Sequence, residues 1–395
     1  MKRVFVTGAG LVSSIGKSVE ENLKSLRSGI CGISKAEFLK TSYTESLPFG
    51  EVKISNEEIN SEFEIEKKGA TRTGLLALKA VNECIESSGL TKAELESETT
   101  ALIGATTVGG MCLTDELYRD ANSKHEASEF IDSYEAGAAT RFLINHFKIG
   151  GYVNTINTAC SSSANSIIFG ARLIKNGYAN RVIAGGVDSL AKFTINGFNS
   201  LHILAAGQCM PFDNGRSGLN LGEGAGFLVL EGEDTIGQKP LLGEITGYAN
   251  TNDAFHPSSL SEEGKGPILS MQRAIQMAHL DNSAIGYINT HGTGTENNDL
   301  VESRAMIRVF ETPPPFSSTK SNIGHTLGAA GSIEAIYGLL NLQHQEVFPA
   351  LNFITPIQET GLIPVSKNEK LKINHVMSNS FGFGGNCTSL IISKI

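Results

Sequence analysis

The 395-residue chain combines 40% hydrophobic residues with 43 glycines and a formal net charge of −9. This length and composition predict a globular protein with a large core or two domains, and they exclude a disordered chain. The acidic balance argues against a general nucleic-acid binder, which needs a basic face to neutralise phosphates. No apolar run approaches the roughly 18 residues of a membrane span. We therefore expect a cytoplasmic protein with neither nucleic-acid nor membrane partners.

Short β-branched runs alternate with helical patterns along the chain. Strand-like runs occupy residues 3–8, 100–110, 181–189 and 226–232, and a helical pattern covers 74–90. Strands separated by helices predict an α/β fold with a largely parallel sheet. In the first run, Gly8 and Gly10 predict a short strand that ends in a tight turn. Ser13 stands where a dinucleotide-binding fingerprint needs its third glycine, which argues against such a site.

A charged stretch that contains glycine and proline marks an internal boundary near residue 240. The parts on its two sides, 1–240 and 241–395, are loosely alike. Each contains a polar turn that leads into a helix (157–174 and 319–342), and later a glycine-rich turn that leads into an apolar strand (222–231 and 382–393). This pattern suggests two similar halves that arose by duplication and pack as one body.

Cys160 differs from the other five cysteines in its surroundings. Small polar residues 161–165 follow it, and an apolar helical pattern begins after them. This pattern places the thiol at a helix N-terminus, where backbone N–H groups and the positive end of the helix dipole favour a thiolate. Two readings remain open at this point: a buried cysteine in a capping loop, or a nucleophile that needs partners elsewhere in the chain.

Two histidines in glycine-rich turns are candidate partners for such a nucleophile. His291 follows a short strand and precedes the run Gly-Thr-Gly-Thr, and His325 lies five residues after Lys320. Two separate turns of this kind, each with hydroxyl or lysine side chains nearby, indicate a catalytic site more strongly than one would. Phe381 and Phe383 lie among glycines near the C-terminus. They are either packing anchors or part of a loop that supplies a backbone N–H donor and a mobile ring.

Taken together, five motifs in this order resemble the β-ketoacyl-acyl carrier protein synthases, the condensing enzymes of fatty-acid and type II polyketide synthesis. The motifs are NTACSSSANSI (157–167), MPFDNGRSGLNLGEGAG (210–226), THGTGTENNDLVE (290–302), STKSNIGHTLGAAG (318–331) and NSFGFGGN (379–386). The resemblance covers essentially the full length. It implies a thiolase-like fold of two similar halves in αβαβα layers, usually dimeric.

The resemblance also implies a role for each matching residue. Cys160 would accept an acyl chain from an acyl carrier protein, and a malonyl-carrier thioester would then lose CO2 and attack that chain. The product would be a 3-oxoacyl chain two carbons longer. The remaining assignments are His291 and His325 as donors to the developing enolate, Lys320 as the residue that orients His325, Phe383 as oxyanion donor and gate, Thr293 and Thr295 as phosphopantetheine contacts, and Met111 and Phe381 as substrate-pocket residues.

No cofactor is required by this scheme, because phosphopantetheine arrives on the carrier protein. Some members bind a structural Na⁺ or K⁺, and the matching positions are Asn289, Glu334, Ser378 and Asn379. Lys67, Lys68 and Arg72 are the expected docking cations for an acidic carrier protein. The partner subunit is expected to be a second copy of the chain or a homologous ketosynthase or chain-length factor.

Several features favour an elongating enzyme of a specialised pathway. The second histidine replaces the asparagine of initiating synthases, and the nucleophile that chain-length factors lack is present. Met210 stands where many members have arginine, and Asn386 and Cys387 replace the usual Thr-Asn pair. These departures suggest synthesis of an aryl-polyene or similar pigment. The alternatives are a thiolase that uses Cys387 as a second catalytic cysteine, and a non-catalytic partner subunit.

Overall fold

The computed structural model describes residues 2–65 and 70–395. The first part of the chain forms β1 (Val4–Val12), α1 (Val19–Arg27), α2 (Asn56–Glu62), α3 (Arg72–Ser88), α4 (Lys92–Leu95), β2 (Thr100–Ala105), α5 (Thr114–Ser123), α6 (Ala138–Phe147), β3 (Val153–Ile156), α7 (Ser162–Lys175), β4 (Arg181–Asp188), α8 (Lys192–Ser200) and β5 (Gly224–Gly232). The remainder forms β6 (Gly243–Asn252), α9 (Lys265–Met277), β7 (Tyr287–Asn289), α10 (Glu296–Phe310), β8 (Phe316–Ser317), α11 (Lys320–Ile323), α12 (Ala330–His344), β9 (Glu346–Val347), β10 (Glu369–Lys370), β11 (His375–Phe381) and β12 (Asn386–Ser393). In the described ranges, no helix combines the length and apolar character that crossing a membrane requires.

The sheet topology repeats itself in the two parts of the chain. Hydrogen-bonded strands run in the order β3-β2-β4-β5-β1-β6-β12-β11-β7-β8. The first set consists of β1 to β5, and the second consists of β6, β7, β8, β11 and β12. When the strands of each set are renumbered 1 to 5 in chain order, both sets have the spatial order 3-2-4-5-1. Each set also has two parallel pairs at its outer edge and two antiparallel pairs toward β1 or β6. The predicted duplication is therefore confirmed at the level of topology, and the pairing of β1 with β6 joins the two sets.

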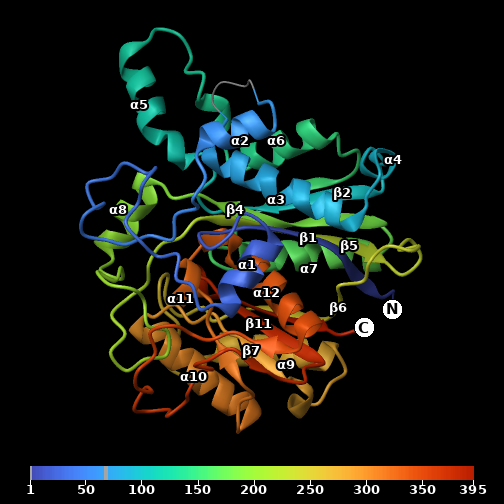
Figure 1. Ribbon diagram of the computed structural model, residues 1–395, viewed down its shortest axis with the longest axis vertical. Helices are drawn as coiled ribbons and strands as arrows, with labels where there is room; N and C mark the ends of the chain where they lie inside the picture. The colour runs from blue at the N-terminus through green and yellow to red at the C-terminus, as the bar shows by residue number, and fades with distance from the viewer. Residues whose placement is uncertain (1, 66–69) are drawn as a thin grey trace.

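Figure 1 shows the helices and strands in alternating layers. α3 and α6 cover the outer face of the first set of strands, and α9 and α10 cover the outer face of the second. α7 and α12 lie between the two sets and carry much of the largest apolar core. They approach each other closely, because a Cβ atom at Gly331 of α12 would lie 2.7 Å from the backbone nitrogen of Ala164 on α7. The five-layered α/β architecture expected from the motifs is confirmed.

Two local predictions about the sheet are wrong. The sheet is not largely parallel, because its central pairs from β4 to β11 are antiparallel. The first strand also does not end at its glycines, since β1 continues to Val12. The glycines instead allow α3 to pack against the strand: a Cβ atom at Gly10 would lie 1.9 Å from the carbonyl oxygen of Ala80. A close helix approach, rather than a turn, requires glycine there.

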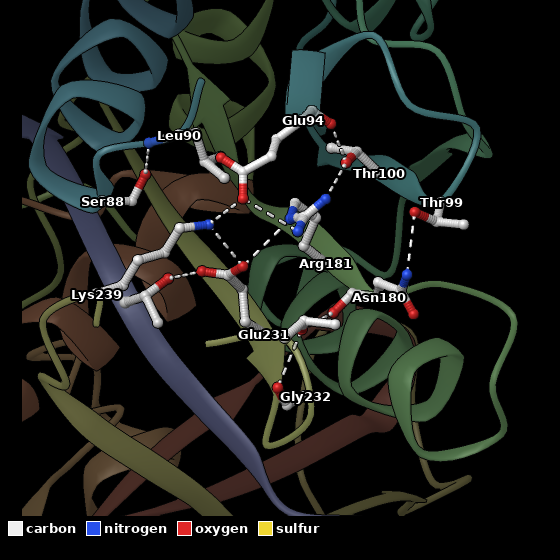
Figure 2. Close-up of polar contacts among 12 residues, drawn as sticks. Ser88, Leu90, Glu94, Thr99, Thr100, Asn180, Arg181, Glu231, Gly232 and Lys239 are labelled. Atoms are coloured by element: carbon white, nitrogen blue, oxygen red, sulfur yellow. Dashed lines mark hydrogen bonds and ion pairs between the residues drawn. The ribbon is translucent and has the colours of Figure 1, made fainter. Parts of the chain in front are cut away.

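A partly buried ion cluster holds the segment that connects the two halves. Figure 2 shows Arg181 at the start of β4 and Lys239 in the connecting segment, and each contacts the carboxylates of both Glu94 and Glu231. Thr7 on β1 donates a 2.8 Å hydrogen bond to Glu231 as well. The pKa of Glu94 is lowered to about 2, because the hydrogen bond from Lys239 and those from Thr91 outweigh the opposing effect of burial. The connector is thus fixed to the first set of strands by charged groups.

Candidate active site

Cys160 lies in the short turn between β3 and α7, two residues before the helix begins. Ala159 has a φ of +54°, a left-handed conformation that is rare for residues other than glycine and that turns the chain sharply. The turn is held by Ser161, whose hydroxyl donates to the carbonyl of Thr158 at 2.7 Å, and by Ser162, whose hydroxyl accepts from the N–H of Thr158 at 2.9 Å. This geometry points the thiol away from the apolar core, into a cavity. The predicted position at a helix N-terminus is confirmed.

The cavity has a volume of about 440 Å³ and brings together residues from both halves. Cys160 and residues 198–203 come from the first half, and the rest of the lining comes mostly from the second. The lining residues predicted from the motifs are Cys160, His291, Thr293, Thr295, His325, Phe381 and Phe383. Residues separated by more than 220 positions in the sequence therefore share one site.

The two histidines lie beside the thiol. The Cys160 Sγ atom and one ring nitrogen from each of His291 and His325 all lie within 4.8 Å of one another. The two imidazole rings are edge to face, with centroids 5.3 Å apart. All three residues are buried. The juxtaposition predicted from the spacing of glycine-rich turns is present.

Hydrogen bonds to the Nδ1 atoms leave the Nε2 atoms of both rings for the cavity. The backbone N–H of Leu327 donates to Nδ1 of His325 at 3.1 Å, so this ring carries its proton on Nε2. The Nζ of Lys320 lies 3.4 Å from Nδ1 of His291 and donates to its carbonyl oxygen at 2.5 Å. An ammonium group only donates, so His291 also carries its proton on Nε2. Lys320 therefore contacts His291, whereas the resemblance implied that it orients His325.

Burial and neighbouring charges keep His291, His325 and Cys160 uncharged. Burial lowers the pKa of His291 well below its ordinary value, and Lys320 and His325 lower it further. Burial and Lys320 do the same to His325. Burial raises the pKa of the Cys160 thiol to about 11, and the backbone N–H of Phe383 and the charge of Lys320 oppose this rise only in part. The site thus presents two neutral N–H donors and a protonated thiol, rather than the thiolate that the helix N-terminus alone led us to expect.

Lys320 is itself buried and forms an ion pair with Glu334 on α12. Burial raises the pKa of Glu334 to about 7, while the lysine favours its charged form. A buried ammonium group is tolerated only when it is paired in this way. The pair therefore fixes the lysine at a defined position behind His291.

The loop after β11 supplies the aromatic residues. Phe381 at the end of the strand packs near His291, with ring centroids 6.0 Å apart. Phe383 stacks on Phe198 at 5.7 Å with an interplanar angle of 15°, and its backbone N–H is directed at the Cys160 thiol. Both rings line the cavity: Phe381 is buried, whereas Phe383 is partly exposed and also places a backbone donor beside the Cys160 thiol.

Asn386 links this loop to the turn that carries the nucleophile. Its Oδ1 atom accepts hydrogen bonds from Ser161 at 2.7 Å, Asn165 at 3.0 Å and Asn250 at 2.8 Å. Its backbone oxygen accepts from the N–H of Gly382 at 2.7 Å. This residue, which departs from the usual family pattern, therefore connects Cys160 and Phe383 through their neighbours.

Two buried acids that we did not single out in the sequence hold the loop of His291. Glu302 accepts from the backbone N–H groups of His291 at 2.9 Å and Gly292 at 2.8 Å. Asp299 accepts from the N–H of Thr293 at 2.9 Å and contacts Gly294. The signal was present in the sequence, since positions 299 and 302 share one face at the start of α10. Thr293 and Thr295 are held in turn, with their hydroxyls 2.9 Å apart.

Three of the four residues expected at a cation site fit such a site. Asn289 and Ser378 are opposite each other in the β7–β11 pair and so share one face. That face is covered by α12, because a Cβ at Gly338 would lie 3.2 Å from Val376 on it. Buried oxygens of Asn289, Ser378 and Glu334 have no hydrogen-bond partner among the described protein groups, which suits a cation that takes oxygen ligands.

The fourth of these residues, Asn379, faces the other way. Its Nδ2 atom donates to Glu302 at 3.3 Å, and its Oδ1 atom accepts from Ser389 at 2.8 Å. Successive residues of a strand point to opposite faces, so the side chain of Asn379 cannot join that of Ser378. The side chain of Asn379 therefore does not fit the expected cation site.

Other expectations fall outside this site. The docking role of Arg72 is wrong: its side chain is 12% exposed and is paired with the fully buried Glu223, so its charge does not face a partner. Lys67 and Lys68 lie outside the described residues. Met111 lines a second cavity of about 670 Å³ together with Leu190 and Phe193, and it is absent from the lining of the cavity that contains Cys160.

Comparisons with known proteins agree with this geometry. A model of the N-terminal domain of beta-ketoacyl synthases matches residues 1–235, and a model of the C-terminal domain matches residues 242–354. The chain is 31% identical over 411 residues to a 3-oxoacyl-[acyl-carrier-protein] synthase 2 of Staphylococcus aureus, covering 100% of this chain and 98% of that protein. A Vibrio cholerae protein of the same name is 31% identical over 418 residues, covering 100% and 99%.

Solved structures extend the comparison to complexes. The ishigamide ketosynthase/chain length factor superimposes with a TM-score of 0.93 at 27% identity, covering 100% of this chain and 99% of that one. A ketosynthase (ApeO) in complex with its chain length factor (ApeC) from Xenorhabdus doucetiae gives 0.84 at 29% identity, covering 100% and 98%. Family models that together match most of the chain, and relatives aligned over their full length, lead to one conclusion. This chain belongs to the beta-ketoacyl synthase family of condensing acyltransferases.

Proposed function

We propose that this chain is an elongating 3-oxoacyl-acyl carrier protein synthase in which Cys160 is the acyl-accepting nucleophile. The observation that carries the proposal is the grouping of the Cys160 thiol with two neutral histidines, each with Nε2–H left for the cavity. A condensing enzyme needs a nucleophile and a pair of donors for an enolate oxygen, and this site contains both.

In the first half-reaction, the Cys160 sulfur attacks the carbonyl carbon of an acyl thioester on the carrier. The carbon–sulfur bond to the carrier breaks, a new thioester forms on Cys160, and the thiol proton passes to the departing carrier thiol. The oxyanion of the tetrahedral intermediate is stabilised by the backbone N–H groups of Cys160 and Phe383, which lie at the thiol. Such donors stabilise the transition state more than the ground state.

In the second half-reaction, a malonyl thioester enters with its pantetheine arm beside Thr293 and Thr295. The bond to its carboxylate breaks, CO2 leaves, and the electron pair forms an enolate whose oxygen accepts from Nε2–H of His291 and His325. Because both imidazoles are neutral, they donate without protonating the carbanion. The enolate carbon attacks the carbonyl carbon of the Cys160 thioester, and the carbon–sulfur bond breaks. The sulfur leaves as a thiolate and takes up a proton from solvent water as the 3-oxoacyl carrier forms.

The partners of this reaction are an acyl carrier protein, in acyl and malonyl forms, and a second subunit. The similarity to ketosynthases solved with a chain length factor supports a homologous partner, and a second copy of the chain is the alternative. Lys67 and Lys68 are proposed as docking cations, and Met111, which lines the second cavity, is proposed as an acyl-pocket residue there. The departures at Met210, Asn386 and Cys387 support a specialised, pigment-type pathway over housekeeping fatty-acid synthesis.

The surroundings of Cys387 argue against a thiolase. A thiolase requires a second cysteine at the substrate, yet Cys387 is fully buried in an apolar cluster with Leu260, Val301 and Phe381. Its thiol donates to the carbonyl of Gly385, and burial raises its pKa. It does not line the cavity that contains Cys160. The presence of Cys160, His291 and His325 together likewise argues against a scaffold without activity.

Purified chain incubated with malonyl-carrier should release CO2, and addition of an acyl-carrier should yield a 3-oxoacyl-carrier extended by two carbons. Carbon dioxide release and mass spectrometry of the carrier measure the two outcomes. Cys387→Ala should leave both rates within about twofold, because that thiol touches no reacting atom. The assay is then repeated with coenzyme A thioesters in place of the carrier substrates. If the unaltered chain is active with them and Cys387→Ala is not, the chain is a thiolase. A chain without decarboxylation, alone or with its homologous partner, would be a scaffold.

We also propose that Asn289, Ser378 and Glu334 hold Na⁺ or K⁺ behind the histidines, where it would add positive charge and rigidity. Thermal unfolding of dialysed protein should shift to higher temperature with either chloride salt, and not with choline chloride at the same ionic strength, because a ligand of the native state stabilises it. Ser378→Ala should lose the shift. Ser270→Ala, a buried serine on α9, should keep it. An equal shift in choline chloride would contradict the proposal.

A further inference from the structure

Asp188, at the end of β4, is a buried carboxylate that the scheme above does not use. It is fully buried, and it forms no ion pair within residues 2–65 and 70–395. Burial raises the pKa of Asp188, and the hydrogen bonds that it accepts from its neighbours oppose this rise. A group of this kind is costly to bury without a cation, so its contacts indicate what it does.

The carboxylate connects two loops that are far apart in sequence. Oδ1 accepts from the N–H of Val108 at 2.8 Å, and both oxygens accept from the N–H of Thr107 at 3.0 Å. The hydroxyls of Thr106 and Thr107 donate to it as well. Oδ2 also accepts from the N–H of Gly328 at 2.7 Å, 140 residues further along the chain. Gly328 lies three residues after His325.

The turn that contains Gly328 is the one that sets the tautomer of His325. Leu327, the residue before Gly328, donates its N–H to Nδ1 of His325 at 3.1 Å. Leu327 has a φ of +51°, a left-handed conformation that is unfavourable for a leucine and persists only where neighbours enforce it. Gly328 must be glycine for the carboxylate to reach it, because a Cβ there would lie 2.8 Å from Oδ2 of Asp188.

We infer that Asp188 is a positioning residue for His325: by holding Gly328 it keeps the N–H of Leu327 on Nδ1 and so keeps the Nε2–H of His325 directed into the cavity. If Gly328 is released, the Leu327 peptide can relax, and Nδ1 loses its donor. The imidazole then has no reason to prefer Nε2–H and no fixed orientation. The inference rests on the proposed function, since Nε2–H serves the decarboxylation step.

Asp188→Asn tests this with little change of shape. Oδ1 accepts from the N–H of Val108 and Oδ2 accepts from the N–H of Gly328. The amide nitrogen of asparagine would therefore face a backbone N–H donor in either orientation, and two donors cannot form a hydrogen bond. We expect malonyl-carrier decarboxylation, measured in a Cys160→Gln background, to fall about tenfold or more, as when one oriented donor is lost. Acylation of Cys160, measured by mass spectrometry with the cysteine intact, should change by less than about threefold, because it uses backbone donors.

Glu51→Gln provides the matched control. Glu51 is also a buried carboxylate that accepts from three backbone N–H groups, those of Glu37, Phe38 and Leu39, and it lines no part of the catalytic cavity. A similar loss of stability is expected there, without the selective loss of decarboxylation. If Asp188→Asn lowers acylation and decarboxylation by the same factor, or if Glu51→Gln reproduces its pattern, the role is structural and the inference is wrong.

A spectroscopic readout separates this inference from the proposed function. In ¹⁵N-histidine-labelled protein, the His325 nitrogens should report protonated Nε2 in the unaltered chain and a tautomer mixture in Asp188→Asn. In Gly328→Ala, the added Cβ atom would push the Asp188 carboxylate away from residue 328, so this variant should give the same tautomer mixture. It replaces Asp188→Asn in the experiment if Asp188→Asn does not fold. An unchanged tautomer in the folded variant overturns the inference. Absence of decarboxylation by Cys160→Gln with Asp188 intact would instead overturn the proposed function.

Discussion

Replacing Cys160 by alanine should abolish acylation of the chain and lower condensation by on the order of 10⁴-fold or more, because the cavity then loses the thiol that would carry the acyl chain. Incubation with an acyl-carrier followed by intact-protein mass spectrometry measures the first effect, and product analysis measures the second. Cys160→Gln should block condensation equally but retain malonyl decarboxylation, since its side-chain amide imitates the acylated cysteine and leaves both histidines in place.

The other cysteines provide the controls for this experiment. Cys84 on α3 is fully buried in the outer core, far from the cavity lining, and Cys84→Ala should acylate normally. Full condensation by Cys160→Ala would contradict the assignment of the nucleophile. Peptide mapping could also locate the acyl group on Cys31, a partly exposed thiol near α1. That result would likewise contradict the assignment of Cys160 as the nucleophile.

The same thiol should show a pH dependence set by its burial. With a pKa of about 11, Cys160 is protonated at neutral pH, and its reactive thiolate increases about tenfold with each pH unit below that value. Alkylation of Cys160 by iodoacetamide should therefore accelerate steadily from pH 7 to 10. A plateau near pH 7 would show that the helix N-terminus and the Phe383 N–H outweigh burial in the folded protein.

Loss of Lys320 should have the second largest effect, on both activity and stability. Lys320→Met removes the ammonium group from Nδ1 and the carbonyl of His291 and leaves Glu334 buried without its cation. Breaking a buried pair in this way destabilises proteins by about 3 to 5 kcal/mol. Decarboxylation should fall by about 10²- to 10³-fold, because His291 loses the contact that orients its donor.

The double variant Lys320→Met, Glu334→Gln separates the two effects. It removes the unpaired charge as well, so we expect most of the free energy of unfolding to return while decarboxylation stays low. Urea unfolding and CO2 release measure the two quantities on one preparation. If activity returned together with stability, Lys320 would act only through the integrity of the fold. If Lys320→Met left decarboxylation unchanged, the assignment of Lys320 to the active site would be wrong.

Much of the fold was accessible from the sequence because the signals are local. Short apolar runs predicted β2, β4 and β5, and a helical period predicted α3. The polar turn at Cys160 predicted the N-terminus of α7. The direction of neighbouring strands was not accessible in this way, because pairing depends on residues far apart, and the central antiparallel pairs were missed. The local sequence predicts a turn at Gly10, because nothing local reveals that Ala80 lies against it.

The candidate site divides in a similar way. Cys160, His291 and His325 stand out in the sequence because each lies in a turn that no apolar packing explains, and their motifs together identify the family. The sequence by itself thus determined which side chains form the candidate site. Their protonation and orientation were decided only by the tertiary structure, since burial depends on every layer and the donors at Nδ1 come from Lys320 and Leu327. The same holds for Arg72, whose charge is a docking cation or half of a buried pair according to whether Glu223 faces it.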